Sequence, residues 1–422
     1  MRVALARRRR LLAVGLSIAA AGGIAAGCGS SSSKESSKPG SGGGGSLTVW
    51  HYFAVDTQTA VLKQQDASFI AKHPGVKIKL VFVPFANMNQ KLIAAAAAGT
   101  GPDVIIADGA GSVQLAAAHA IKDMTSCVDT WSAKDDLLPV SKRVVDGKTL
   151  GVLPYGNLVA LWYNKTILDK YHLKPPTTLD EMETDLATVT KGGDKGLLLD
   201  GTPTFTSAWS AQGLFTAQGV EYPNIDTPAT TSAFQRLGGW ASKGWVPRDV
   251  TSMDQPTAMN KFLTGKYAFT INGNWEIEHA KKDAKFDYGV TTLPNGADPG
   301  RPYISGETAM LGNFSKNGAL ACQYLNETWF SPAGQRLTLK GIGSLPMLKS
   351  LQDEPQLKSD PIISVFVKQA SNATSVPPGN QFTGNSTVWG PAISKMWAGN
   401  DNPAGLAKKA MADLKGVLAK KE

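Results

Sequence analysis

The chain has 422 residues, a formal net charge of +9 and three cysteines. Residues 1–27 carry five arginines and no acidic residue, so the charge falls from +9 to +4 without them. Because that charge is mild and no dense basic patch with interleaved aromatic residues is present, we do not expect nucleic acid as a partner. Metal-ligand spacings of Cys or His, glycine-rich phosphate loops and nucleophile elbows are also missing, so we expect neither a metal nor a cofactor.

Residues 1–27 have the organisation of a signal peptide, and residues 28–46 follow as a tether. An arginine-rich start precedes an apolar run, 11–26, that is too short for a comfortable membrane span. The sequence Ala-Ala-Gly before Cys28 resembles the bacterial lipobox, which implies that Cys28 is lipidated. The alternative is an ordinary cleavable signal with a chance cysteine, and the export route stays open between the general and twin-arginine systems. The Ser- and Gly-rich tether cannot bury apolar area. We therefore expect an extracytoplasmic lipoprotein anchored to the bacterial cell membrane.

The chain beyond the tether is long enough for two domains and opens with alternating strands and helices. Strand patterns at 47–53, 76–82 and 103–107 alternate with helical patterns at 58–73, 88–98 and 112–120. This β-α-β-α-β order predicts an α/β fold with a doubly wound parallel sheet.

Residues 266–271 alternate as a further strand, which Asn272, Gly273 and Asn274 interrupt. Asn274 is placed to cap a helix, with Trp275 in its first turn just past the strand end. Ligands of open α/β sheets bind beyond the carboxyl ends of strands, and an indole there offers a flat apolar face. Trp275 is therefore either a ligand residue or a packing residue between strand and helix.

An ordered set of stretches resembles the extracellular solute-binding proteins of bacterial ABC importers, above all the family that binds sugars and oligosaccharides of the maltose type. The set includes GTGPDVIIAD, DGKTLGVLPYGNLVALWYNKTIL, PPTTLDEM, AMNKFLTGKYAFTINGNWEI, YGVTTLPNG and GIGSLPMLKS. The resemblance covers nearly the whole chain after the tether. It implies a monomeric, non-enzymatic protein that captures a carbohydrate and delivers it to the permease subunits of an ABC importer. The alternatives are a non-sugar solute on the same fold, such as a quaternary ammonium compound in an aromatic cage, or a carbohydrate-active enzyme.

The resemblance also implies a periplasmic-binding-protein fold. Two doubly wound lobes would be joined by three chain crossings, with the ligand cleft between them. The matching stretches place these crossings near 155–157, 291–293 and 341–346. Lobe one would then hold 47–156 plus 293–342, and lobe two 157–292 plus 343–422.

A sugar site combines hydrogen-bonding side chains with flat aromatic faces. Tyr52 lies at the end of the first strand, and Asp108 follows the apolar third strand, where capping of the next helix is its alternative role. The resemblance places Tyr155 and Asn157 on the first crossing. Asn157 stands where maltose-type relatives have an acid, which weakens any role carried over to it.

The resemblance implies further ligand residues along the later part of the chain. Trp209, with Phe205 as its competitor, and Trp389 match stacking positions of the family, as does Trp275. Gly306 and Glu307 follow the second crossing, where Gly306 permits close backbone approach and Glu307 is either a ligand residue or a surface ion-pair partner.

The remaining tryptophans and cysteines have structural interpretations. We expect core or surface packing for Trp131, Trp162, Trp240, Trp245, Trp329 and Trp397. Cys127 and Cys322 are either a disulfide in an oxidising compartment or two unpaired buried cysteines, and both fall in the expected lobe one.

Overall fold

The computed structural model describes residues 45–399 and 402–420, which belong to one compact unit. The predicted signal peptide, Cys28 and almost all of the tether lie outside the described residues. Within the described ranges, no helix is long and apolar enough to span a bilayer.

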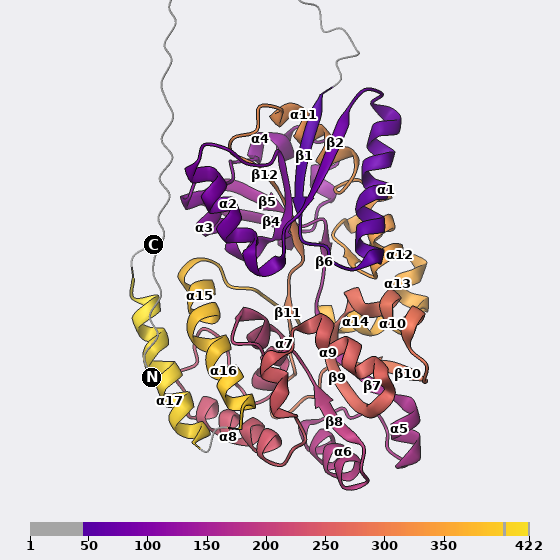
Figure 1. Cartoon of the computed structure of the whole chain (residues 1–422), viewed down its shortest axis with the longest axis vertical. Coiled ribbons are helices and arrows are strands. Elements are labelled where there is room, and N and C mark those ends of the chain that lie inside the picture. The colour runs from indigo at the N-terminus through magenta and orange to yellow at the C-terminus, as the bar shows by residue number, and fades with distance from the viewer. Residues whose placement is uncertain (1–44, 400–401, 421–422) are drawn as a thin grey trace, which may run out of the picture. The chain divides into compact units, whose positions relative to one another are not determined.

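The first of two main sheets has six strands in the order β2-β1-β3-β12-β5-β4 (Figure 1, upper half). β1 is parallel to β2 and β3, as the sequence predicts, but β12 is antiparallel to β3, so the sheet is mixed. Its strands are β1 Ser46–His51, β2 Lys77–Phe82, β3 Val104–Asp108, β4 Lys142–Val145, β5 Lys148–Val152 and β12 Glu307–Leu311.

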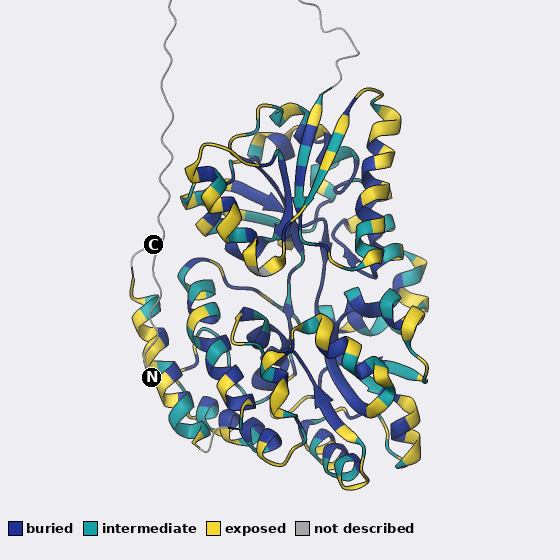
Figure 2. Ribbon diagram, viewed as in Figure 1, coloured by how far each residue is buried: buried dark blue, intermediate teal, exposed yellow. Residues whose placement is uncertain are grey.

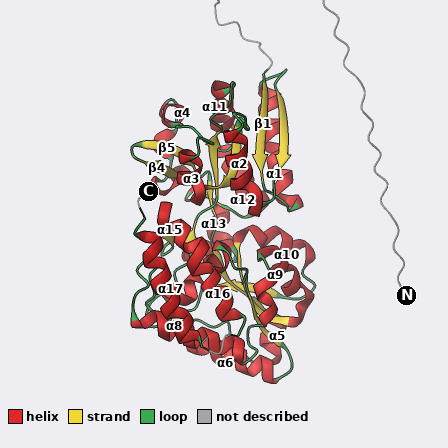
Figure 3. Cartoon of the chain, turned by 60° about the vertical axis from the view of Figure 1, so that its left-hand side comes forward, coloured by secondary structure: helices red, strands yellow, loops and turns green. Residues whose placement is uncertain are grey.

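Both faces of this sheet are covered. Val104 and Ile106 of β3 join one buried cluster and Ile105 and Ala107 join another, as expected for a strand whose alternate side chains point to opposite faces. Helices flank the strands (Figure 3), and the buried residues follow the sheet (Figure 2). These helices are α1 Asp56–Lys72, α2 Met88–Ala97, α3 Ser112–Ala117, α4 Thr125–Asp129, α11 Gly318–Glu327 and α12 Pro332–Ile342.

The second main sheet has four strands in the order β10-β7-β9-β8 and is also mixed. Every residue of β9 is buried, as expected for a strand whose two faces are both covered. The strands are β7 Val159–Asn164, β8 Lys195–Leu198, β9 Tyr267–Gly273 and β10 Tyr288–Thr291. The helices around them are α5 Lys165–Lys170, α6 Leu179–Lys191, α7 Phe205–Thr216, α8 Pro228–Ser242, α9 Gln255–Lys261, α10 Ile277–Asp283, α13 Pro355–Ser359, α14 Ile363–Ala370, α15 Gly379–Gly384, α16 Gly390–Trp397 and α17 Pro403–Leu418.

The chain passes between the six-stranded and four-stranded halves near three places, and the first of them lies after β5. There, β6 (Tyr155–Gly156) pairs with β13 (Leu345–Pro346) between β5 and β7. The second crossing comes later in the chain than the expected 291–293, because Leu293 and Tyr303 are still buried in the core of the four-stranded half. The segment that meets the first crossing is at Ser305, which forms an isolated bridge with Asn157 and whose backbone N–H donates to the Asn157 carbonyl at 3.0 Å.

The last passage also falls later than predicted. Leu348 and Leu351 pack in the core of the six-stranded half, and Leu357 of α13 is the next residue in the core of the other half. The predicted crossing at 341–346 instead supplies β13.

A further small sheet pairs β11 (Tyr303–Ile304) with β14 (Thr374–Ser375).

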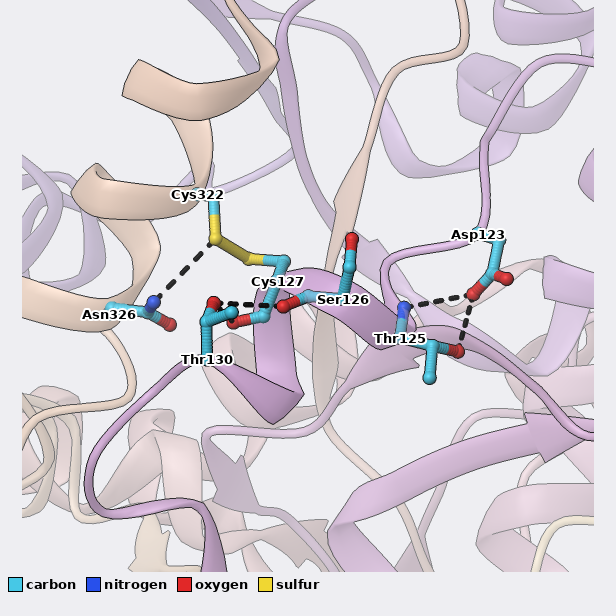
Figure 4. Close-up of a disulfide and its surroundings, with 7 residues drawn as sticks. All are labelled: Asp123, Thr125, Ser126, Cys127, Thr130, Cys322 and Asn326. Atoms are coloured by element: carbon cyan, nitrogen blue, oxygen red, sulfur yellow. Dashed lines mark hydrogen bonds between the residues drawn. A yellow bond between two sulfur atoms is a disulfide. The ribbon is translucent and has the colours of Figure 1, made fainter.

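The six-stranded half contains a disulfide between Cys127 of α4 and Cys322 of α11, which are separated by 195 residues (Figure 4). The Asn326 side chain donates to the Cys322 sulfur at 3.6 Å. Of the two alternatives left by the sequence, the structure has the bonded pair.

Candidate ligand-binding site

One edge of the six-stranded sheet brings together three of the predicted site residues. Tyr52 follows the end of β1, Asp108 ends β3, and Glu307 begins β12. Because β12 runs antiparallel to β3, Glu307 lies directly opposite Asp108 in the pairing register. The Tyr52 hydroxyl donates to Oε1 of Glu307 at 3.2 Å. The sheet thus gathers two carboxylates and a phenol from segments far apart in sequence.

Glu307 is buried rather than on the surface, so its predicted alternative as a surface ion-pair partner is wrong. Its Oε2 accepts a hydrogen bond from Nδ2 of Asn157 at 3.0 Å, while Oε1 accepts from Tyr52. Burial raises the pKa of Glu307, and the neighbouring Asp108 adds to that rise. The Tyr155 hydroxyl is buried beside this carboxylate without a well-formed hydrogen bond.

Asp108 has the capping role that was its alternative interpretation. Its Oδ1 accepts a 2.7 Å hydrogen bond from the backbone N–H of Ala110, in the short turn Gly109–Gly111. Burial raises the pKa of Asp108, although the Ala110 N–H and the charge of Arg143 oppose the rise. Its side chain stays partly exposed, so capping by one oxygen does not exclude a contact by the other.

Arg143 is a charged residue of this region that the sequence did not indicate. It lies on β4, interacts with Asp108 through its charge, and donates from Nη2 to the Ser305 hydroxyl at 3.1 Å. Its Nε is buried without a partner among the described residues. No local pattern marks an arginine on a short edge strand, so only the fold connects it to the site.

The chain crossings meet in a buried network of amides around Asn157. The Asn157 Oδ1 accepts from the Ser344 hydroxyl at 2.8 Å and from Nδ2 of Asn274 at 3.2 Å. Gly306 lies in the same place, where an added Cβ would be 2.4 Å from the Tyr155 carbonyl oxygen. With its amide bonded on both sides, Asn157 connects the crossings to Glu307, and Gly306 allows the backbones to approach.

Asn274 does not cap a helix, contrary to the prediction. Its fully buried side chain makes no capping bond; its Oδ1 accepts from the backbone of Leu158 at 3.0 Å, and its Nδ2 donates to the carbonyl of Gly343 at 3.0 Å. These partners are remote in sequence, with separations of 116 and 69 residues. Asn274 therefore holds the four-stranded half to two passages of the chain.

Trp275 lies in the short helical turn Asn274–Glu276 just past β9, as predicted, and stays partly exposed. Its ring covers Gly273, where an added Cβ would lie 2.1 Å from the indole. Glu276 is buried and bonds Nδ1 of His279 at 2.7 Å. The turn is thus fixed on both sides of Trp275, while part of the ring remains available for contact.

The other two predicted stacking tryptophans are in different surroundings. Trp209 of α7 is 6% exposed and packs against Phe205 and Tyr303, with ring centroids 5.8 and 6.1 Å away. Its indole N–H is buried without a partner among the described residues. Trp389 is 0% exposed, between Phe215 and Phe234, so in this structure it is a core residue and not a stacking surface.

The tryptophans assigned to packing have that role. Five are buried, and Trp245 is partly exposed beneath the ammonium group of Lys243, 4.2 Å from the ring centroid. The buried five are Trp131, Trp162, Trp240, Trp329 and Trp397.

The two mixed sheets and the crossings between them form the periplasmic-binding-protein fold. A family model described as bacterial extracellular solute-binding protein matches residues 64–365. The chain therefore belongs to this family of solute binders, which is non-enzymatic. The family resemblance found in the sequence is confirmed.

Two curated relatives and one solved structure illustrate the similarity. The maltotriose-binding protein of Pyrococcus abyssi is 26% identical over 82% of this chain and 75% of its own length. A protein named maltooligosaccharide ABC transporter solute-binding lipoprotein, from Streptococcus pneumoniae, is 24% identical over 85% of this chain and 86% of its own. The maltotriose-binding protein of Thermus thermophilus, solved with maltotriose, has a TM-score of 0.75 and 25% identity, covering 88% of this chain and 100% of that one.

Proposed function

We propose that this protein captures an oligosaccharide outside the cytoplasm and presents it to the permease of an ABC importer. The observation that carries the proposal is the joining of Tyr52, Asp108 and Glu307 at one sheet edge, which the Asn157 network connects to the passages between the halves. Relatives named for maltotriose and maltooligosaccharides support the solute class, and one of those names includes an ABC transporter.

The chemistry of the residues suits a sugar. Sugar hydroxyls need both donors and acceptors, which a phenol and carboxylates provide, and the C–H face of a sugar ring needs flat apolar surface. Partly exposed Tyr52, Asp108 and Trp275 are the proposed contacts, with the unpartnered indole N–H of Trp209 as a further donor. Tyr155, Asn157, Gly306 and Glu307 position these contacts.

A thermal-shift screen tests the solute class. A ligand that binds only the folded state raises the melting temperature by mass action. We expect a shift with maltotriose or another neutral oligosaccharide and none with amino acids or quaternary ammonium compounds. A shift confined to the charged compounds would overturn the proposal in favour of the non-sugar alternative.

We also propose that the protein is held at the membrane through a lipid on Cys28. The small residues before Cys28 and the lipoprotein among its relatives support this anchor. When cells expressing the full chain are partitioned with detergent, the Cys28→Ala variant should move to the aqueous phase, whereas a Ser30→Ala variant should stay in the detergent phase. Retention of both variants in the detergent phase would remove the anchor.

A further inference from the structure

Four neighbouring strands end or begin at the edge that carries the proposed site. In the sheet order β2-β1-β3-β12, Tyr52 directly follows β1, Asp108 ends β3 and Glu307 begins β12. β2 ends at Phe82, and the chain continues through the short helical turn Phe85–Asn87 before α2. Phe85, which follows the outermost strand β2, therefore lies at the same edge of the sheet. Neither the family motifs nor the proposed function involves it.

Phe85 is directly connected to the proposed site. Its ring meets the Tyr52 ring edge to face, with centroids 5.1 Å apart and planes at 87°. The hydroxyl of that same Tyr52 bonds Glu307, the acid opposite Asp108. A continuous row of contacts therefore leads from the two carboxylates through the phenol to the phenylalanine.

Phe85 does not serve the hydrophobic core. Its side chain is 47% exposed, although its neighbour Val83 is fully buried. An exposed aromatic ring beside hydrogen-bonding groups is the surface on which the C–H face of a sugar ring can stack. Because the Phe85 side chain already packs against Tyr52, it loses little conformational freedom when a ligand covers its ring.

We infer that Phe85 forms an aromatic subsite for a further ring of the oligosaccharide, beyond the ring held at Asp108 and Glu307. The inference rests on the proposed function and adds a property to it: the protein discriminates between short and longer chains of the same sugar. Only a ligand long enough to reach past Tyr52 gains from this ring.

The chain offers a matched control in Phe82. It is the last residue of β2, three positions before Phe85, and is 49% exposed, so its truncation changes surface apolarity as much as that of Phe85. Its aromatic neighbour is His51, at 6.0 Å, and not Tyr52. In the β1–β2 register Phe82 lies opposite His51, one residue before Tyr52.

The experiment is calorimetry with a maltose series and a galactooligosaccharide series, each of two, three and four rings. The wild type, Phe85→Ala, Phe85→Trp and Phe82→Ala are titrated. We expect Phe85→Ala to weaken the longest sugar that the wild type binds by about threefold to tenfold, the range given by one aromatic stacking contact. The affinity of Phe85→Ala for the shortest bound sugar should equal that of the wild type. Phe85→Trp, which keeps an aromatic ring at this position, should still prefer the longer sugars, and Phe82→Ala should bind every sugar as the wild type does.

Two failures are distinguishable. In the first, the wild type binds the sugars while Phe85→Ala and Phe82→Ala bind every chain length with the same affinity as each other. That result would overturn the subsite and leave the proposed function intact. Absence of binding of either series to the wild type would overturn the oligosaccharide proposal, and the subsite with it. Melting curves of both alanine variants without ligand should match the wild type, because neither side chain is buried.

Discussion

Burial separates two tryptophans that the sequence presents alike. Trp275 keeps part of its ring exposed beside a fixed turn, whereas Trp389 is enclosed by the rings of Phe215 and Phe234. An enclosed ring can only contribute to stability, while an exposed one can gain contacts when a solute arrives. The same substitution should therefore have different consequences at the two positions.

Trp275→Ala should weaken ligand binding by about 2 kcal/mol or more, roughly thirty-fold in affinity, because a ring buried by the ligand is lost. Trp389→Ala should instead cost about 3–5 kcal/mol of stability through a core cavity. Calorimetry reports the first quantity and urea denaturation without ligand the second. Near-normal affinity of Trp275→Ala together with a large loss of stability would contradict its ligand role.

Asp66 is a buried acid outside the proposed site. Its Oδ1 accepts a 2.7 Å hydrogen bond from the Tyr324 hydroxyl, and burial raises its pKa to about 6. Because the folded state holds a proton that the unfolded state releases near its lower pKa, this group makes the protein less stable as pH rises from about 4 to about 6. Above that window its penalty stays constant.

Asp66→Asn keeps an acceptor for Tyr324 but removes the titration. At pH 7 the variant should be more stable than the wild type by about 1–3 kcal/mol, and the difference should shrink at about pH 4.5. Urea denaturation at the two pH values measures both quantities. An equal difference at the two pH values would show that Asp66 does not titrate in this window.

At the scale of elements, the passages between the halves depend on Asn274. Its side chain connects the turn that follows β9 to Leu158 before β7 and to Gly343 before β13. One buried amide thus bonds to two other backbone segments, which the β6–β13 pairing and the Asn157–Ser344 hydrogen bond also bring together.

Asn274→Ala should cost about 1–3 kcal/mol of stability, because buried backbone groups lose their partner. Asn317→Ala provides the comparison, since its amide makes an exposed hydrogen bond to the Ser46 carbonyl and should matter by no more than about 0.5 kcal/mol. Equal unfolding midpoints in urea for the two variants would mean that the buried network contributes nothing measurable.

The sequence predicts individual elements better than it predicts the contacts between them. Alternation and helix periodicity placed α1, β2, α2, β3 and β9 to within a few residues, because these signals are local. Asn274 was misassigned because its partners are remote, and Trp389 because its burial depends on α7 and α8. The second crossing was placed too early, since the loop after β10 first packs Leu293 on the four-stranded half.

At the scale of the whole described unit, we predict closure of the two halves around the ligand. They are joined by a few passages of chain, and one exposed contact between the halves is the 2.8 Å hydrogen bond from Gln114 to Thr383. Rigid-body rocking on such connections is a common response to a ligand. Small-angle scattering should give a smaller radius of gyration with a saturating bound sugar than with a sugar that does not bind; equal radii would exclude closure.

Oligosaccharide capture can be measured by calorimetric titration of the tether-free protein with maltotriose, longer maltooligosaccharides and galactooligosaccharides. We predict one-to-one binding of at least one of them with micromolar or tighter affinity, about −8 kcal/mol or stronger. Substitution of Tyr52 by alanine should weaken that binding, because it removes the phenol joined to Glu307. No binding of any of these sugars, with a charged non-sugar solute bound instead, would contradict the proposed function.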